Sequence, residues 1–307
     1  MNRPKYVFWF MIDGCRGSGF HSLDSLDTPN IDDLIKENTI YSFKGLSDYP
    51  SSTMHNVPGM LTGNYTETHE YSNTTGTDVE SIMSVFLDND MTTGGVDGKD
   101  GDRLTGFDNQ DEWTYFRTVE TDRPTNRQDQ IAVDELWDIF NTNETNFNYV
   151  LMADTDYSGH DHGHTSDEYK GAIENADEII GDFIDKLKAN GYYEDSLIVI
   201  NSDHGMTETS HGSDSLGDMR IPVIIHCPLA QNIHFDKIMK ERSRFGNVFY
   251  PEQMDITTTI CRIMGLRDND DHEGILLPAG ENQELKDEFE ITTIQTNRRD
   301  RRRYMFI

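Results

Sequence analysis

The stretch that decides the fold is YVFWFMIDG, residues 6–14. Its seven apolar residues follow one another without a polar position, which is typical of a strand buried on both faces of a parallel sheet. The run stops at Asp13-Gly14, so a carboxylate stands where the strand gives way to a loop. Thr28 and Pro29 then suit the N-cap and first turn of a helix. A strand followed by a helix favours an α/β fold.

The same pattern recurs further along the chain. Apolar runs at 149–153, 197–200 and 221–225 predict three more core strands. The polar residues Asp154, Asp156 and Asp203 follow two of these runs, as Asp13 follows the first. Ligands bind outside the carboxyl ends of parallel strands, so these four aspartates are the first candidates for a site.

Helix signals fall between and after these strands. Thr165 and Glu168 have the spacing of a capping box, and an amphipathic stretch continues from them to Gly191. A later helix is predicted over 253–264 with Gly265 as its C-cap, and residues 290–307 are predicted to form a hairpin.

Residues 74–145 have a different composition, rich in Gly, Asp, Asn and Thr. We predict that this range is an inserted cap over the active site, and that residues 1–73 and 146–307 form the catalytic domain. Aromatic residues scattered through the insertion either stack on a nucleobase or form its small core, and the core is the favoured alternative. They are Phe107, Trp113, Tyr115 and Phe116.

Charge and cysteine content limit the partners and the compartment. Against 56 Asp and Glu the chain has 26 Lys and Arg, a formal net charge of −30, so we expect neither a nucleic-acid polymer nor a membrane as partner. Cys15, Cys227 and Cys261 lie far apart, which favours reduced thiols. The first apolar run is too short to span a bilayer, and we predict a soluble, cytoplasmic protein of undetermined oligomeric state.

Two acid-histidine pairs indicate a metal site. Asp156 precedes His160 by four residues, Asp203 is followed directly by His204, and His211 comes seven residues later. Carboxylates and imidazoles are the ligands that Zn and Mn take, and with Asp13 the set could hold two ions. Each residue alone has a simpler explanation, as a helix cap, a turn residue or a solvated loop histidine.

Taken together, the order and spacing of these motifs resemble the alkaline phosphatase superfamily, most closely its type I phosphodiesterase/nucleotide pyrophosphatase branch. The segments that carry the resemblance are FMIDGCRG, TPNIDDLIKEN, YPSSTMHNVPGMLTGNYTETHEY, DYSGH, NSDHGM, EQMDITTTICRIMGL and the final RRRYMFI. The resemblance implies a three-layer α/β/α fold with a central, mostly parallel sheet. It also implies a hydrolase that cleaves phosphodiester or phosphoanhydride bonds of a small molecule, a nucleotide among the candidates.

The same resemblance assigns roles to individual residues. Thr53 takes the position of the nucleophile, which forms a phospho-threonine intermediate, and Thr62 follows it at the family's spacing of nine residues. Asn73 is a candidate phosphate contact near the expected place. Two divalent ions are implied, zinc or alternatively manganese. Their implied ligands are Asp13, Thr53, Asp203 and His204 for one ion, and Asp156, His160 and His211 for the other.

The chain departs from the family pattern at two points. The last ligand histidine lies much farther downstream in many phosphodiesterases, whereas His211 here fits phosphopentomutase-like and sulfatase-like members better. The alternatives for this ligand are His162, His164 and His272. A sulfatase is not expected, because its nucleophile is a Cys or Ser that leads a Pro and Arg signature, and STMHN contains neither Pro nor Arg.

The charge of the implied centre bears on the substrate. Two dications against three carboxylates leave a net +1, which attracts an anion and suits the single charge of a phosphodiester. An arginine such as Arg16, Arg103, Arg117 or Arg127 could add to this charge. The alternatives are a phosphomonoesterase, phosphonate hydrolase or phosphomutase on the same fold, or a metal-dependent binding protein without turnover.

Overall fold

A single sheet organises the molecule. The computed structural model describes residues 3–20, 26–36, 38–99, 103–119, 128–229, 250–267, 272–274 and 277. Its strands are β1 (Tyr6–Ile12), β2 (Thr39–Leu46), β3 (Thr93–Asp97), β4 (Tyr115–Thr118), β5 (Phe147–Met152), β6 (Ser196–Asn201) and β7 (Arg220–His226). They form a seven-stranded sheet in the order β2-β7-β6-β1-β5-β3-β4. Only the pairs made by β7 are antiparallel, which confirms the expected mostly parallel sheet.

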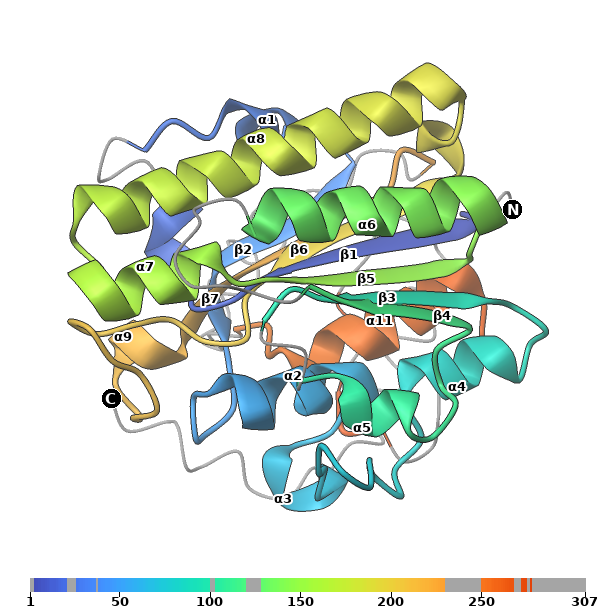
Figure 1. Ribbon diagram of the computed structural model, residues 1–307, viewed down its shortest axis with the longest axis horizontal. Helices are drawn as coiled ribbons and strands as arrows, with labels where there is room; N and C mark the ends of the chain where they lie inside the picture. The colour runs from blue at the N-terminus through green and yellow to red at the C-terminus, as the bar shows by residue number, and fades with distance from the viewer. Residues whose placement is uncertain are drawn as a thin grey trace, which may run out of the picture.

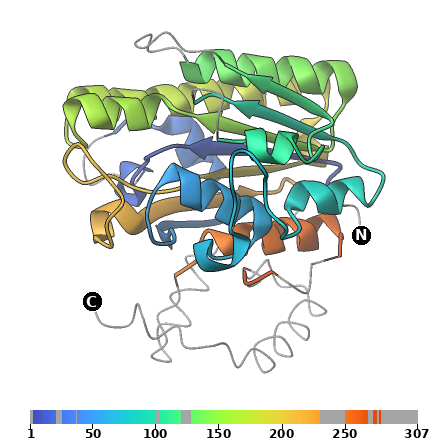
Figure 2. The same cartoon turned by 60° about the horizontal axis from the view of Figure 1, so that its bottom comes forward.

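Helices cover both faces of this sheet. The longer ones are α2 (Thr53–Thr62), α6 (Gln128–Asn143), α7 (Asp154–His162), α8 (Asp167–Asn190) and α11 (Met254–Met264). The shorter ones are η1 (Gly17–Phe20), α1 (Pro29–Leu34), α3 (Thr66–His69), α4 (Ile82–Leu87), α5 (Thr105–Asp108), η3 (Tyr193–Asp195) and α9 (Leu216–Met219). Helices α1, α6 and α8 lie on one side of the sheet and α2, α4, α5 and α11 on the other (Figures 1 and 2). The fold is therefore the expected three-layer α/β/α sandwich.

Strand β1 lies in the middle and explains why its sequence has no polar position. Val7, Trp9 and Met11 belong to the core under α2 and α11, whereas Phe8 and Phe10 belong to the core under α6 and α8. Each large apolar side chain buried in this way contributes about 1.5 to 3 kcal/mol. Pairing with β5 on one side and β6 on the other leaves the carboxyl ends of three strands next to one another.

Strand pairings extend the sheet into the range 74–145, whose role as an inserted cap stays a prediction. Strands β3 and β4 lie within residues 74–145, and β3 pairs with β5 along Thr93–Asp97. Trp113 is buried against Phe147 and Tyr149 of β5 rather than placed for a ligand. The glycine-rich, polar composition predicts an insertion over the site, and short strands such as TGGVD need little apolar sequence when their neighbours supply the core. The described strands of this range therefore extend the sheet.

Local signals at helix ends are mostly confirmed. Thr28 is the N-cap of α1 with Pro29 in the first turn, and Gly265 ends α11 with φ of 71°. Helix α8 starts one residue later than predicted, because the hydroxyl of Ser166 rather than Thr165 caps it by accepting from the N–H of Tyr169. The hairpin predicted over 290–307 and Arg127 lie outside the described residues. Among the described residues, none of the helices has the length and apolar character needed to cross a membrane.

Candidate active site

The site lies at the carboxyl edge of the sheet, as the strand ends predict. Asp13 follows β1, Asp203 follows β6 after one intervening serine, and Asp156 lies in the first turn of α7 beyond β5. Gly14 has φ of 70° and passes so close to Asp156 that a Cβ there would lie 3.0 Å from the carboxylate oxygen. Its N–H donates to Oδ1 of Asp203 at 3.2 Å. The turn after β1 therefore brings all three aspartates together.

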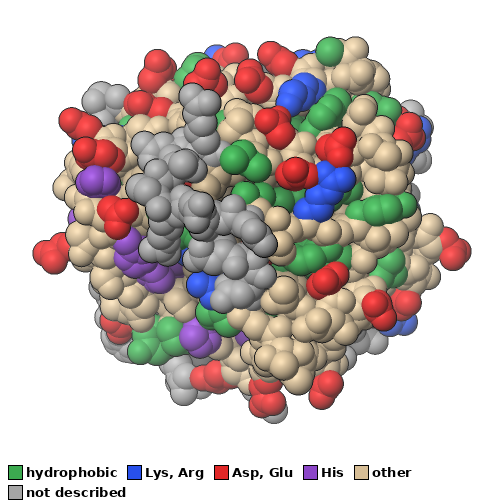
Figure 3. All heavy atoms as spheres, viewed as in Figure 1, with side chains coloured by type: hydrophobic (Ala, Val, Ile, Leu, Met, Phe, Trp, Pro, Cys, Tyr) green, Lys and Arg blue, Asp and Glu red, His purple; other side chains and the backbone are tan. Residues whose placement is uncertain are grey.

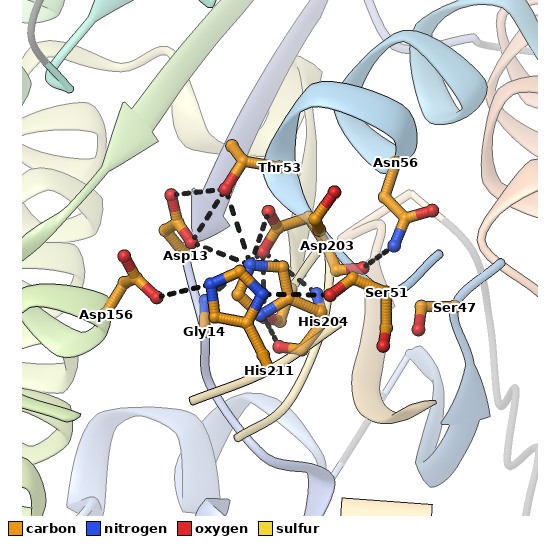
Figure 4. A network of polar contacts seen from close by, with 12 residues as sticks. Asp13, Gly14, Ser47, Ser51, Thr53, Asn56, Asp156, Asp203, His204 and His211 are labelled. Carbon is orange, nitrogen blue, oxygen red and sulfur yellow. Dashed lines mark hydrogen bonds and ion pairs between the residues drawn. The ribbon is translucent and has the colours of Figure 1, made fainter. Parts of the chain in front are cut away.

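Thr53 reaches this centre from the other side. It is the first residue of α2, and its hydroxyl Oγ1 lies 3.3 and 3.4 Å from the two carboxylate oxygens of Asp13. The Nε2 of His204 is 3.4 Å from the same hydroxyl. Figure 4 shows Asp13, Thr53, Asp203 and His204 pointing toward one another. The hydroxyl thus faces the helix N-terminus and the centre together, where negative charge that develops on it is stabilised.

The three histidines present the same nitrogen to the centre. The Nδ1 atoms of His160, His204 and His211 lie 2.8 to 2.9 Å from the backbone carbonyls of Thr209, Gly205 and Ser51. A carbonyl only accepts, so each Nδ1 carries the proton. Each Nε2 is therefore left to face the centre, an orientation that ligating histidines commonly have.

The spacing of these Nε2 atoms requires a cation. Those of His160 and His211 are 3.2 Å apart, and both face Oδ1 of Asp156 at 3.4 and 3.6 Å. Two nitrogen lone pairs at that distance repel unless a proton or a metal ion lies between them. Burial and the adjacent His204 lower the pKa of His211, which disfavours the proton. The pair is therefore suited to a metal ion.

Two carboxylate oxygens of the centre also have lone pairs available for a metal ion. Oδ1 of Asp156 and Oδ2 of Asp203 are buried and make no hydrogen bond to another described residue. Two groups of side chains could each hold a metal ion, Asp156–His160–His211 and Asp13–Asp156–His204. Within each group, the ligand atoms lie within 4.8 Å of one another. The residues present therefore fit divalent ions, since these oxygens and nitrogens are the donors that zinc and manganese take. Asp156 belongs to both groups.

Electrostatics point the same way. Burial and the carboxylate of Asp203 raise the pKa of Asp13 to about 7, against the opposing charge of Lys99. Burial also acts to raise the pKa of Asp156, but Lys99 and two neighbouring histidines outweigh it and lower that pKa below its ordinary value. Crowded buried carboxylates of this kind are stabilised by positive charge.

Lys99 is the residue of the centre that the sequence analysis did not identify. Its ammonium Nζ lies 2.6 Å from Oδ2 of Asp13, 2.7 Å from Oδ2 of Asp156 and 3.2 Å from the hydroxyl of Thr53. It follows β3 after one glycine, so the rule that singled out Asp13 applies to it as well. It was passed over because residues 74–145 were expected to lie outside the sheet.

Other candidate residues lie around the centre rather than in it. The side-chain amide of Asn73 and the guanidinium of Arg103 both contact Sδ of Met54, at 3.5 and 3.0 Å, directly beside Thr53. Both side chains therefore lie beside the residue that follows Thr53. His162 is exposed, and His272 is buried against Gly63.

Two more predicted alternatives are placed outside the centre. His164 lines a pocket of about 310 Å³ with Arg16, Tyr169 and Lys170, behind the turn after β1. Arg117 is paired with Glu135 and with Asp138 on α6. Of the histidines weighed for the last ligand position, His211 is thus the one whose ring lies against the centre.

The surface around the site is acidic overall. Figure 3 shows Asp and Glu side chains spread over the face rather than gathered at one place, and histidines gathered on the side where α7 and α9 lie. His160 is about 39% exposed and His211 about 15%, whereas Asp13 and Asp203 are fully buried. The centre therefore opens to solvent on the histidine side of α7.

Comparison with known proteins agrees with this geometry. Residues 99–221 match the family model of type I phosphodiesterase / nucleotide pyrophosphatase, a range that contains Lys99, Asp156, His160, Asp203, His204 and His211. Bis(5'-adenosyl)-triphosphatase ENPP4 of Pongo abelii is 37% identical over 65 residues, which are 21% of this chain and 14% of that protein. The aligned part is thus a small fraction of the relative.

Solved structures share the fold. An inactive variant of murine ectonucleotide pyrophosphatase / phosphodiesterase 5 in complex with AMP superposes with a TM-score of 0.68 at 13% identity, covering 94% of this chain and 99% of the other. Phosphonate monoester hydrolase from Silicibacter pomeroyi superposes with a TM-score of 0.65 at 16% identity, covering 91% and 78%. At these identities the likeness concerns the fold.

Proposed function

Because the chain belongs to the alkaline phosphatase superfamily, on its type I phosphodiesterase/nucleotide pyrophosphatase branch, we propose that it is a metal-dependent hydrolase of a small phosphorylated molecule. Its substrate bond is a phosphodiester or phosphoanhydride, with nucleotides among the candidate substrates. One observation carries the proposal: the buried hydroxyl of Thr53 faces a cluster of carboxylate oxygens and imidazole nitrogens that a bound cation would stabilise. A cytoplasmic location remains a prediction.

Two divalent ions, zinc or alternatively manganese, complete the proposed centre. Asp13, Thr53, Asp203 and His204 would hold one ion, and Asp156, His160 and His211 the other. When bound, such ions lower the pKa of a coordinated hydroxyl and neutralise charge on the phosphate. A centre of net +1 attracts the substrate anion even though the chain as a whole carries −30.

The residues of the chain then have separate tasks. Thr53 attacks phosphorus through Oγ1, the bond to the leaving oxygen breaks, and a phospho-threonine forms. Water then attacks the phosphorus, breaks the bond to Oγ1 and returns the hydroxyl to Thr53. The centre opens beside His160 and His211, so water and the leaving group pass on that side. Asn73 and Arg103, which flank Met54, are placed to orient the phosphate.

The test is hydrolysis of bis-p-nitrophenyl phosphate and p-nitrophenyl phosphate, side by side, by zinc- or manganese-loaded protein. We expect Thr53→Ala to lower kcat by about three orders of magnitude or more, because it removes the nucleophile. Thr66→Ala, at the first position of α3, is the matched control and should keep full activity. Metal content is measured in both variants, so that loss of an ion is distinguished from loss of the nucleophile.

The outcomes separate the candidate functions. A Thr53-dependent preference for the diester supports the proposal. Metal binding without turnover of any phosphate ester would favour a non-catalytic binding protein. A preference for the monoester would favour the second candidate, a phosphomonoesterase or a related phosphonate hydrolase or mutase. The observation in its favour is Lys99, whose charge raises the net charge of the loaded centre from +1 to +2 and so suits a dianion.

A further inference from the structure

Lys99 lies where an ion of the proposed centre would bind. Its Nζ is 2.6 and 2.7 Å from one oxygen each of Asp13 and Asp156, and its side chain is 6% exposed. Asp13 and Asp156, with His204, are also one of the two groups able to hold a metal ion. The ammonium and such an ion therefore compete for the same two carboxylates.

Hydrogen bonds hold the backbone that leads from β3 to Lys99, so we expect its side chain to be the part that moves. Oδ1 of Asp97 accepts from the N–H of Lys99 at 2.9 Å, and Oδ2 accepts from the N–H groups of Arg103 and Leu104 at 2.8 and 3.1 Å. The preceding Gly98 donates to the carbonyl of Leu151 at 3.1 Å. Gly98 and Lys99 are thus tied to β5 and to Asp97.

We propose that Lys99 is an exchangeable cation of this site: it holds Asp13 and Asp156 together in the metal-free protein, is displaced by the ion, and then contacts the phosphoryl group on Thr53. This inference rests on the proposed function, because it assigns a further substrate-contacting residue to that same site. It adds a positive group on the nucleophile side of the phosphate, where Arg103 lies close by.

Displacement follows from distances. Zinc binds carboxylate oxygen at about 2.0 to 2.2 Å, so an ion on Asp13 or on Asp156 would lie within a few ångströms of the ammonium that the same carboxylates hold. Two like charges that close repel strongly in a buried site. The ion has the additional imidazole ligand of His204, whereas the ammonium has only hydrogen bonds. The lysine side chain has a flexible four-carbon stem, so the ammonium is the group that moves.

The position of Thr53 indicates where the displaced ammonium of Lys99 would bind. Nζ is 3.2 Å from Oγ1, the atom to which the phosphoryl group becomes attached. A phosphoryl group on Oγ1 would therefore bring its non-bridging oxygens within hydrogen-bonding reach of Nζ. A lysine ammonium binds phosphate as a point charge and does not need the fixed geometry of a guanidinium.

The first experiment measures zinc affinity by calorimetry in wild type and Lys99→Met, beginning from metal-free protein. Because the competing charge is absent, we expect the tighter zinc site to bind about tenfold more strongly in Lys99→Met. Lys99→Arg keeps the charge and should stay close to wild type. Lys186→Met removes a lysine of α8 that pairs with Asp134, far from the centre, and should have no effect.

The second experiment measures the affinity of zinc-loaded protein for inorganic phosphate. Here we expect the opposite direction, about tenfold weaker binding in Lys99→Met, because a charge-assisted contact to phosphate is lost. A merely structural lysine would weaken zinc and phosphate binding together. Zinc affinity that is unchanged or weaker in folded Lys99→Met, or phosphate affinity equal to wild type, would overturn the inference.

A third measurement uses only the wild-type chain, in case Lys99→Met does not fold without metal. The reactivity of Lys99 toward acetic anhydride is followed by peptide mass spectrometry, with Lys186 as internal reference. We expect protection in the metal-free protein, labelling after zinc, and renewed protection after zinc plus phosphate. Equal labelling in all three states would contradict the inference. If wild type binds no zinc at all, the proposed function itself fails, whereas zinc binding that is indifferent to Lys99 refutes this inference alone.

Discussion

At the scale of single residues, the site consists of histidine nitrogens and carboxylate oxygens that face the centre and are available to a metal ion. Each of the three histidines has its Nδ1 at a backbone carbonyl, which leaves only Nε2 for the centre. Oδ1 of Asp156 and Oδ2 of Asp203 are buried without a hydrogen bond to a described residue. In a metal-free protein such an arrangement costs free energy, because a buried polar atom without a partner loses its hydration and gains no compensating hydrogen bond.

A second pair of buried carboxyls lies beside the centre and affects stability. The N–H of Asp154 donates to Oδ1 of Asp129 at 3.0 Å, and the N–H of Asp129 donates to Oδ2 of Asp154 at 3.3 Å. Burial raises the pKa of Asp154 to about 6, against the opposing backbone hydrogen bonds. Asp154 is one of the strand-end candidates, and it holds the start of α6 to the start of α7.

This pair predicts a loss of stability as pH rises. An unfolded aspartate ionises near pH 4, so from there to about pH 6 the folded protein holds a proton that the unfolded chain has released. Over that window the free energy of unfolding should fall by about 1 to 2 kcal/mol more in wild type than in Asp154→Asn. Urea unfolding at pH 4, 5, 6 and 7 measures this difference. Asp185→Asn, an exposed aspartate of α8, is the control, and parallel pH curves for wild type and Asp154→Asn would contradict the account.

At the scale of elements, the site depends on the order of strands at one edge. β1, β5, β6 and β3 each end next to a residue of the centre, because parallel strands present their carboxyl ends on the same side. Strand β3 supplies Lys99, although it lies in the range whose composition suggested a cap. The matched family segment begins at Lys99 and continues through β5 and β6.

If β3 and β4 belong to the catalytic core, damage there should affect the whole protein. Trp113 is buried between Gly95 and the β5 residues Phe147 and Tyr149, so Trp113→Ala should destabilise folding by about 3 to 5 kcal/mol. Tyr115→Ala removes an aromatic residue that is about 39% exposed and should have little effect. We expect thermal unfolding followed by circular dichroism to show one transition that shifts as a whole. Two separate transitions, with only one of them shifted, would contradict the assignment of β3 and β4 to the same cooperative core.

What the sequence could predict follows from where the signal lies. The apolar runs of β1, β5, β6 and β7 predicted the sheet, because strands buried on both faces have no polar positions. The short strand TGGVD gave no such signal, since two of its five residues are glycines and its core contacts come from Trp113 and Ile139. Lys99 was missed for that reason. A rule that treats every Gly-Lys or Gly-Asp after a short apolar or glycine-rich run as a strand end would have found it.

At the scale of the whole molecule, charge and fold work in opposite directions. The chain carries −30, which repels anions in general, yet the proposed centre collects positive charge at one opening. Two dications and Lys99 against three carboxylates would make that opening the place where a phosphate is attracted. On this proposal, selectivity for phosphate would be a property of the loaded centre, and the net charge of −30 would disfavour nucleic-acid polymers.

The central claim is that this centre transfers a phosphoryl group to Thr53. The measurement that tests it most directly is peptide mass spectrometry of zinc-loaded protein quenched in acid during turnover of p-nitrophenyl phosphate and, separately, a nucleotide. The account predicts phosphorylation of the peptide that contains residue 53, on the threonine itself, and none in protein treated with a chelator before substrate is added. Turnover at full rate with residue 53 unmodified, and equally fast in Thr53→Ala, would contradict it.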